Sequence, residues 1–419
     1  MSRTIDLSGI NFTDIYGYED ARAIQSKRYE EAIASFDEAF GDDGSIEIYS
    51  APGRTEIGGN HTDHQKGEVL AASINKDAIA FVRRDDTGKV RVISGKAKVI
   101  TMSVTDLEKI DSEEGTTAAL IRGVIFYLKD KGFSVGGFDA YITSDVLIGA
   151  GLSSSAAFET LIGTIISGLY NNMEIDPVVI AMAGQFAENK FFGKPCGLMD
   201  QMACSVGNLV HIDFKDTDNP EVERVDFDFS KTPYCLCITD TKGSHSDLTD
   251  EYAAIPSEMK EIAKLLGHEV LRPVTLDDIL DNIAMLREKA GDRAVLRAIH
   301  FVAETRRAGD EAAALKTNNL EAFLKLVRQS GNSSFKYLQN AYTSSDITHQ
   351  NMSVALAVSD AILGDDEVSR VHGGGFAGTI QAWVKTENSG NYQKTMDKIF
   401  GEGSCEILKI RKYGGMKIL

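Results

Sequence analysis

Apolar residues follow two different periods in the first part of the chain, and these predict a mixture of helices and strands. Residues 17–40 place apolar side chains three and four positions apart, which predicts an amphipathic helix, and residues 117–132 also predict a helix. The apolar run at 46–52 predicts a strand, and 77–95 predicts two strands joined by an Asp-Asp-Thr-Gly turn. Residues 137–148 predict a strand that leads into a loop rich in glycine and serine.

The remainder of the chain continues this mixture. Thr275 with Asp278 three residues later resembles a capping box, and therefore a helix start. The other expected elements are, in chain order, helices at 154–170 and 177–192, strands within 205–214 and at 233–241, helices near 292–307 and 319–330, and strands at 378–385 and 405–410. Helices and strands occur in both halves, so the fold class predicted is α+β.

Length and composition indicate a globular protein of two domains. The chain has 419 residues, of which 43% are hydrophobic and 25% charged, as in soluble globular proteins. Residues 215–225 are polar, charged and contain a proline, so we expect domains at 1–220 and 221–419.

Charge and cysteine usage narrow the choice of partners. The chain has 62 acidic and 44 basic residues and a net charge of −18, which argues against binding to nucleic acid or to an anionic membrane. The N-terminal stretch lacks an apolar signal region, and no window approaches the roughly 18 apolar residues of a membrane span. The five cysteines form no Cys-x-x-Cys pair, so we expect reduced thiols in a cytoplasmic protein.

The most informative segment is VLIGAGLSSSAAF at 146–158. Glycines allow close approach of the backbone to an anion, and serines cap the helix whose free N–H groups face it. A glycine- and serine-rich turn that only caps a helix has the same composition. The Gly-x4-Gly-Lys pattern and the Gly-x-Ser-x-Gly pattern are both absent. The predicted phosphate-binding residues are Gly149, Gly151, Leu152, Ser153, Ser154 and Ser155.

A second segment, APGRTEIGGNHTDHQKG at 51–67, places many polar side chains among four glycines. Convergent donors and acceptors suit a polyhydroxylated ligand. Metal binding by His61, Asp63 and His64 is an alternative, and a solvated loop is another.

Two further segments stand out. AENKFFGKPCGLMDQM at 187–202 contains Glu188 and, in an apolar context, Asp200, for which a helix N-cap is the simpler explanation. RVHGGGFAGTIQAWV at 370–384 has four glycines ahead of a strand, which indicates a tight turn or a second ligand loop.

Together these four segments resemble the GHMP small-molecule kinases, and among them the galactokinases. VLIGAGLSSSAA is similar to the nucleotide loop of that family, CGLMDQ to its catalytic aspartate segment and HGGGFAG to its third glycine motif. APGRTEIGGNHTDHQKG is similar to the galactokinase signature Gly-Arg-x-Asn-x-Ile-Gly-Glu-His-Thr-Asp. The resemblance spans roughly residues 17–413. It implies an N-terminal lobe like ribosomal protein S5, a C-terminal ferredoxin-like lobe, and an active site in the cleft between them.

The resemblance also implies a reaction. ATP would donate its γ-phosphoryl group to the anomeric hydroxyl of a sugar, most simply galactose, with Mg²⁺ held by Ser155 and Glu188. Asp200 would accept the hydroxyl proton, and Arg54 would pair with it. The implied sugar contacts are Asn60, His61, Asp63, Gly197 and Tyr252. The sugar and ATP are the only partners expected, and the chain is expected to be a monomer or a weak homodimer.

Several positions depart from the galactokinase pattern. Asn60 replaces the glutamate expected at the primary hydroxyl of carbon 6, which leaves open a sugar altered there, such as galacturonate, arabinose or another hexose. Residues 341–366 do not follow the usual Ser-x-Pro-Glu-Leu-Asp segment. A sensor that binds sugar and nucleotide without turnover is a second class, although the Gly/Ser loop, Asp200 and Arg54 are intact.

Overall fold

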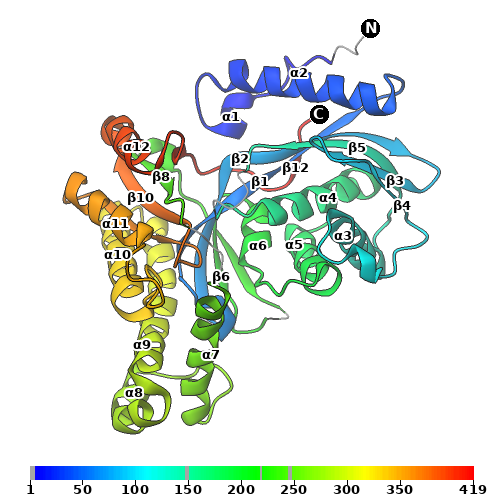
Figure 1. Ribbon diagram of the computed structural model, residues 1–419. Helices are drawn as coiled ribbons and strands as arrows, with labels where there is room; N and C mark the ends of the chain where they lie inside the picture. The colour runs from blue at the N-terminus through cyan, green and yellow to red at the C-terminus, as the bar shows by residue number, and fades with distance from the viewer. Residues whose placement is uncertain (1–4, 147–150, 218, 244–247) are drawn as a thin grey trace.

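A computed structural model describes residues 5–146, 151–217, 219–243 and 248–419. It contains two β-sheets with helices on their faces (Figure 1), which confirms the α+β class. The first sheet has the strand order β12-β1-β2-β5-β3-β4, with β6 and β7 added beside β2, and the second has the order β11-β8-β10-β9.

The first sheet is built mainly from the N-terminal half of the chain. Its strands are β1 (Glu47–Gly58), β2 (Glu68–Asp85), β3 (Lys89–Ser94), β4 (Ile100–Ser103), β5 (Gly137–Ser144), β6 (Leu209–Asp213), β7 (Glu221–Val225) and β12 (Met416–Lys417). Side chains of β1 alternate between the two faces, so that Ile48 packs under the N-terminal helices and Tyr49 packs on the opposite side. Both faces are covered, and β1 is therefore buried along almost its whole length.

The predicted strand pair at 77–95 is present, but its two strands are not neighbours. Strand β5 lies between β2 and β3, antiparallel to the first and parallel to the second. A Cβ at Gly137 would lie 2.4 Å from the carbonyl oxygen of Lys89, so only glycine lets β5 begin inside this turn.

Helices cover the two faces of the first sheet unequally (Figure 1). Helices α1 (Phe12–Tyr16) and α2 (Ala21–Phe40) lie on one face. The other face carries α3 (Thr117–Asp130), α4 (Ser154–Asn171), α5 (Pro177–Phe186) and α6 (Met199–Val206). The predicted helix at 177–192 is α5 continued by a π-helix, η3 (Ala187–Phe192), which ends at Gly193.

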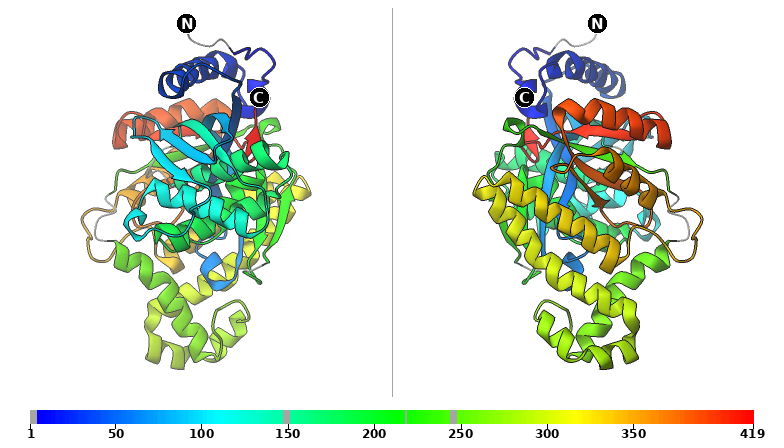
Figure 2. Two further views of the ribbon diagram at one scale, coloured as in Figure 1. Left: turned by 90° about the vertical axis from the view of Figure 1, so that its right-hand side faces the viewer. Right: turned by 90° about the vertical axis from the view of Figure 1, so that its left-hand side faces the viewer.

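The second sheet comprises β8 (Tyr234–Asp240), β9 (Val368–His372), β10 (Thr379–Lys385) and β11 (Cys405–Leu408). Its associated helices are α7 (Thr249–Leu265), α8 (Leu276–Asp281), α9 (Ile283–Lys316), α10 (Leu320–Ser333), α11 (Asn351–Ile362) and α12 (Thr386–Phe400). Helices α9 and α10 extend along one side of the molecule (Figure 2). The capping box predicted at Thr275 and Asp278 is confirmed at the start of α8.

One hydrophobic core joins the two sheets. It contains Ile57 and Leu70 from the first sheet, Leu236 and Trp383 from the second, and Leu152 beside the glycine- and serine-rich loop.

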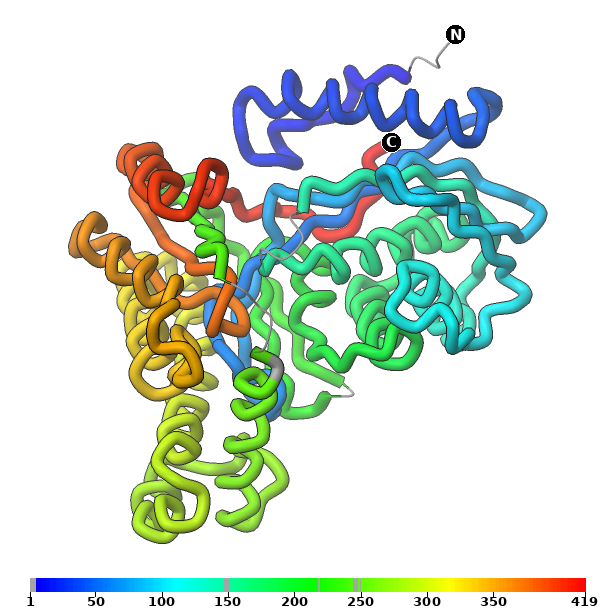
Figure 3. The backbone as a smooth tube through the Cα atoms, in the orientation of Figure 1, coloured from blue at the N-terminus to red at the C-terminus, as the bar shows by residue number. Residues whose placement is uncertain are grey.

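The C-terminal end of the chain returns to the first sheet: after β11 it forms β12, which pairs with β1 (Figure 3). Strands β7 and β12 of the first sheet both lie beyond residue 220, and the domain boundary there stays a prediction. In the described part of the chain, no helix has both the length and the apolar character to cross a bilayer.

Candidate active site

The site is centred on an ion pair between Arg54 and Asp200. Arg54 lies on β1 at an irregularity in the pairing with β2, and Asp200 lies in the first turn of α6. The guanidinium donates two hydrogen bonds, from Nε to Oδ1 at 2.7 Å and from an Nη to Oδ2 at 2.8 Å. The Arg54 side chain is buried, whereas 33% of the Asp200 side chain is exposed. A bidentate pair of this kind fixes the carboxylate and leaves one side of it accessible.

The surroundings of Asp200 keep it ionised. Burial alone would raise the pKa of Asp200, but the charge and hydrogen bonds of Arg54 and the hydroxyl of Ser153 outweigh it and lower that pKa. Asp200 is therefore a weak proton acceptor that is fully charged at neutral pH.

The glycine- and serine-rich loop lies directly on this pair. The backbone N–H of Arg54 donates to the Leu152 carbonyl at 3.1 Å, and its guanidinium donates to the Gly151 carbonyl. A Cβ at Gly53 would lie 2.9 Å from the Leu152 carbonyl oxygen, so this contact depends on glycine. Gly149, the other predicted glycine of the loop, lies outside the described residues.

Ser153 is the N-cap residue of α4, but its hydroxyl does not cap the helix. It donates instead to Oδ2 of Asp200, with the Ser153 backbone in the left-handed region at φ 56°. The first backbone hydrogen bond of the helix runs from Ala157 to the Ser153 carbonyl. The N–H groups of Ser154 and Ser155 therefore have no partner within the helix, as an anion-binding helix start requires.

A second carboxylate, Glu188, lies on the other side of α6. Its Oε2 accepts from Nε2 of Gln201 at 3.0 Å, and its Oε1 lies 3.4 Å from Nζ of Lys194. The same amide group of Gln201 donates to Glu159 at 3.0 Å. Burial and then the charge of Glu188 raise the pKa of Glu159 well above its ordinary value.

These residues fit the magnesium site that the resemblance implies. Glu188 already has a cation beside it, and the Ser155 hydroxyl has no hydrogen-bond partner among the described residues. Glu159 lies one helical turn after Ser155 on α4. Mg²⁺ needs only one or two protein oxygens when phosphates supply others.

The turn after β1 contributes Asp63, which lies close enough to Asp200 to be affected by its charge. A Cβ on Gly197 would lie 2.3 Å from Oδ2 of Asp63, so this aspartate packs against the segment that leads into α6. Burial and the charge of Asp200, together with smaller effects, raise the pKa of Asp63. Burial lowers the pKa of His61 to about 4 and that of His64 to about 3, so both imidazoles are neutral.

The third glycine motif completes the site through its carbonyl groups. Gly373 accepts from Nδ2 of Asn60 at 2.7 Å, and Gly375 accepts from the Tyr252 hydroxyl at 2.7 Å. Nε2 of His61 lies 2.9 Å from the Gly374 carbonyl oxygen. The structure therefore brings the four sequence segments together.

The side chain of Asn60, a predicted sugar contact, is fully engaged by protein groups. Its Nδ2 also donates to Glu56 at 3.0 Å, and its Oδ1 accepts from Asn340 at 2.9 Å and from Ser334 at 3.2 Å. Asn60 is completely buried. These bonds use all the donors and acceptors of the amide, so no polar atom of this side chain is left for a sugar hydroxyl.

The alternative of a protein-held metal centre finds no support. Within the described residues, no group of three or more His, Cys, Asp or Glu side chains is arranged to hold a metal ion. His61 and His64 contact each other, with Nδ1 of the first 3.4 Å from Nε2 of the second.

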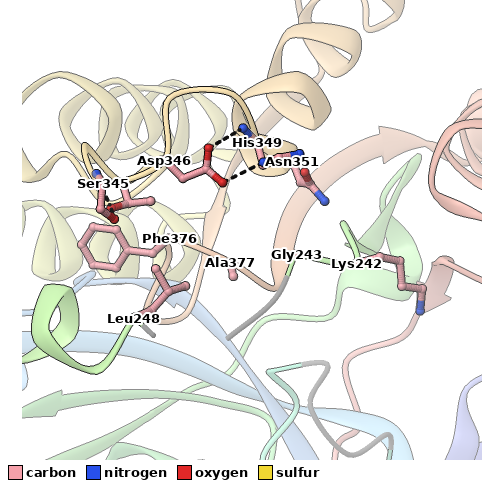
Figure 4. A pocket seen from close by; sticks show the side chains of 10 residues that line it. Lys242, Gly243, Leu248, Ser345, Asp346, His349, Asn351, Phe376 and Ala377 are labelled. Atoms are coloured by element: carbon pink, nitrogen blue, oxygen red, sulfur yellow. Dashed lines mark hydrogen bonds and ion pairs between the residues drawn. The ribbon is translucent and has the colours of Figure 1, made fainter. Parts of the chain in front are cut away.

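A pocket of about 480 Å³ lies beyond the third glycine motif (Figure 4). Phe376 and Ala377 of that motif form part of its wall, together with Leu248 and the segment around Asp346 and His349. Phe376 also packs edge-on against Tyr252, with ring centroids 5.4 Å apart. The segment 341–366, which departs from the galactokinase pattern, therefore shares this pocket with Phe376, whose ring contacts Tyr252.

Glu159, Gln201 and Lys194 were not singled out from the sequence. The available signal was Glu159, which interrupts the otherwise apolar helix Ser154–Asn171 and is completely buried. A buried carboxylate in such a helix needs a partner from another element. That partner, Gln201, lies 42 residues away, so helical spacing cannot identify it.

Two family models match the chain. The galactokinase galactose-binding signature matches residues 34–84, and the GHMP kinases N terminal domain matches residues 119–208. The chain is 30% identical to the galactokinase of Glaesserella parasuis serovar 5 over 82% of its own length and 88% of the relative. It is 31% identical to the galactokinase of Actinobacillus pleuropneumoniae serotype 5b over 84% of its own length and 88% of that relative.

Solved structures show the same fold. Lactococcus lactis galactokinase complexed with galactose has a TM-score of 0.78 at 24% identity, covering 94% of this chain and all of that one. A mevalonate kinase has a TM-score of 0.62 at 16% identity, covering 87% of this chain and 99% of that one. These are two-lobed GHMP kinase folds, which confirms the predicted architecture. Within the GHMP kinases, the chain belongs to the galactokinase family.

Proposed function

We propose that this chain transfers the γ-phosphoryl group of ATP to the anomeric hydroxyl of galactose, giving ADP and galactose 1-phosphate. The single observation that supports this most strongly is the bidentate Arg54–Asp200 pair beside the Ser153 hydroxyl. The pair brings a fixed carboxylate to the start of α4, where a phosphate group would bind. A nucleotide on the loop would therefore meet the acceptor next to Asp200.

Asp200 and Arg54 would act mainly through orientation and charge. Asp200 is too acidic to remove a sugar proton efficiently in the ground state, but it can receive that proton as the new oxygen–phosphorus bond forms. Arg54 keeps the carboxylate in place and offsets negative charge that develops on the transferred group. Phosphoryl transfer asks mainly for such positioning.

The loop residues Gly149, Gly151, Leu152, Ser153, Ser154 and Ser155 would bind the phosphates. Ser155 and Glu188 would hold Mg²⁺, which neutralises phosphate charge when bound. Glu188 is prepared for this role because Gln201 fixes one of its oxygens, while the other lies 3.4 Å from the exposed ammonium of Lys194.

The sugar would lie between the turn after β1 and the third glycine motif. We assign Asp63 and Gly197 to one side of it, and His61 and Tyr252 to the other. A neutral imidazole and a carboxyl group give the mixed donors and acceptors that sugar hydroxyls need. Asn60 would shape this site by holding the Gly373 carbonyl, since its own amide is saturated.

A kinase for a galactose analogue altered at carbon 6 is the second candidate. It is favoured by the uncharged, saturated side chain of Asn60, where the galactokinase signature has glutamate. We further expect the protein to act in the cytoplasm as a monomer or a weak homodimer.

A coupled assay of ADP release with a panel of sugars tests the proposal. Galactose, 6-deoxygalactose, galacturonate and arabinose are compared by kcat/KM at saturating magnesium and ATP. Galactose is expected to give saturable turnover and the highest value. Tight sugar binding by calorimetry without ADP release identifies a sensor instead, and a higher value for a sugar altered at carbon 6 supports the second candidate.

A further inference from the structure

Lys194 is a cation at the edge of the site with only one partner. It lies in the turn after η3, and its Nζ is 3.4 Å from Oε1 of Glu188. About two thirds of its side chain is exposed, at 66%. In the described parts of the chain, its ammonium has no other hydrogen-bond or ion-pair partner. An exposed pair of this length contributes little stability and is readily exchanged.

Glu188 itself is held in place. Its side chain is 5% exposed, and its Oε2 accepts from Nε2 of Gln201 at 3.0 Å. Its backbone carbonyl accepts from the Lys194 N–H at 3.1 Å, which ends the π-helix. The ammonium at the end of a flexible four-carbon chain is therefore the part of this pair that can move.

The charges near Lys194 do not balance once a nucleotide is present. Glu188 and Asp200 both lie within the electrostatic reach of Lys194, and the guanidinium of Arg54 already donates to Asp200 and to the Gly151 carbonyl. The charge of Lys194 contributes to lowering the pKa of Asp200, so the ammonium acts across the gap between the two carboxylates. Phosphate oxygens on the loop would add further negative charge in this gap.

We propose that Lys194 exchanges partners during the cycle: it neutralises Glu188 in the free protein and binds phosphate oxygens once Glu188 is given up to the metal. This inference rests on the function proposed above and adds a phosphate-binding residue to it. Its consequence is that Lys194 favours nucleotide but competes with a metal ion. A residue that only stabilised the turn would not affect the two ligands in opposite directions.

The test compares Lys194→Met with Lys190→Met, which changes an exposed lysine on the π-helix that precedes Lys194. Affinity for ATP without metal is measured by calorimetry in EDTA. Affinity for Mn²⁺ without nucleotide is measured by electron paramagnetic resonance. Lys194→Met is expected to weaken ATP binding on the order of 10-fold to 100-fold, as for loss of a hydrogen bond to a charged group. It is expected to strengthen Mn²⁺ binding about twofold to fivefold, because Glu188 loses a competing cation.

Lys190→Met is expected to change neither affinity. Lys194→Arg is expected to recover most of the ATP affinity, since the positive charge is kept. The proposal is overturned if Lys194→Met binds both ligands like wild type, or if it weakens both. If wild-type protein turns over galactose and the two methionine variants are equal, only this inference fails. If wild-type protein binds no nucleotide, the proposed function fails as well.

Discussion

The aspartate–arginine clusters around Asp77 and Asp200 both involve the first sheet, and they differ in how completely the carboxylate is enclosed. Asp77 on β2 is completely buried and receives hydrogen bonds from Arg28 at 2.6 Å and from Arg411 at 2.9 Å. Asp200 pairs with one arginine and keeps 33% of its side chain exposed. In both clusters burial would raise the pKa of the aspartate, and the arginines outweigh it.

The partners of the two aspartates explain this difference. Asp77 joins segments far apart in the chain, since Arg28 comes from α2 and Arg411 from the stretch between β11 and β12, and the Tyr16 hydroxyl adds a third donor from α1. The carboxylate oxygens of Asp77 are therefore occupied by groups that hold the fold together. Asp200 has one arginine and one serine, both from the loop and strand that surround the proposed phosphate site. An aspartate–arginine pair is structural when the carboxylate is enclosed on all sides, and it is available for chemistry when one side of the carboxylate stays exposed.

The largest effect is expected for Asp200→Asn. The amide keeps the size of the carboxylate but cannot take a proton or balance Arg54, so kcat for galactose should fall by about 10²- to 10⁴-fold. Steady-state ADP release measures this. Circular dichroism serves as the control for folding and should remain close to wild type, whereas the thermal midpoint should fall because the buried Arg54 loses its counter-ion. Retention of more than a tenth of the activity would contradict the role given to Asp200.

Asp77→Asn should have the opposite profile. Removing the charge leaves the buried Arg411 without the carboxylate it pairs with, while Arg28 keeps Asp145 at 3.6 Å, so the free energy of unfolding should fall by about 3–5 kcal/mol. Urea denaturation measures this loss. The kcat per folded molecule should stay within about twofold of wild type, because Asp77 lies outside the site. If Asp77→Asn lost activity while its stability stayed unchanged, the distinction between a structural Asp77 and a catalytic Asp200 would be wrong.

Glu311 extends the comparison to a buried carboxyl with no arginine bound to it. Among the residues that the structure describes, neither of its oxygens has a hydrogen-bond partner, and burial raises its pKa well above the ordinary value of 4.5. The folded protein therefore retains a proton that the unfolded chain loses above pH 4.5. The resulting stability is complete below that pH and declines as pH rises, by up to about 1.4 kcal/mol per pH unit, until the folded-state pKa is reached.

Glu311→Gln should remove this pH dependence. Urea unfolding of both proteins at pH 5 and pH 8 measures it. The variant is expected to gain stability relative to wild type as pH rises. An unchanged difference between the two proteins across this range would show that Glu311 is ionised when folded.

Ser153→Ala is expected to give the smallest effect. The variant loses the hydroxyl that donates to Asp200, so kcat should fall by about fivefold to tenfold. The same hydroxyl lowers the pKa of Asp200, so that pKa should rise and the acid limb of kcat/KM should move to higher pH. A pH–rate profile measures both. An unshifted acid limb would indicate that this limb reports another group.

Local pattern predicted much of this fold. Helix α4 begins at Ser154 as its serine and apolar run require, and the capping box at Thr275 is present. Helices α11 and α12 were not predicted, because their sequences have no strong start signal and form only against the second sheet. The position of β5 between β2 and β3 also depends on pairing across the chain.

The site shows the same division. The resemblance of their segments to the galactokinase motifs indicated Arg54 and Asp200. The structure brings these two residues into contact although they are 146 residues apart in the sequence. The bridge from Gln201 to Glu159 and Glu188 was not predictable, because it joins three helices at positions with no common spacing. The saturation of Asn60 also depends on distant partners, since Asn340 is 280 residues away.

The central claim is that a nucleotide on the loop before α4 faces a sugar hydroxyl beside Asp200. A crystal structure with galactose, magnesium and a non-hydrolysable ATP analogue measures this directly. The account predicts the anomeric oxygen within hydrogen-bond distance of Asp200 and about 3–3.5 Å from the γ-phosphorus, with the phosphates on residues 151–155. A nucleotide bound elsewhere, or a sugar whose anomeric oxygen points away from Asp200, would contradict it.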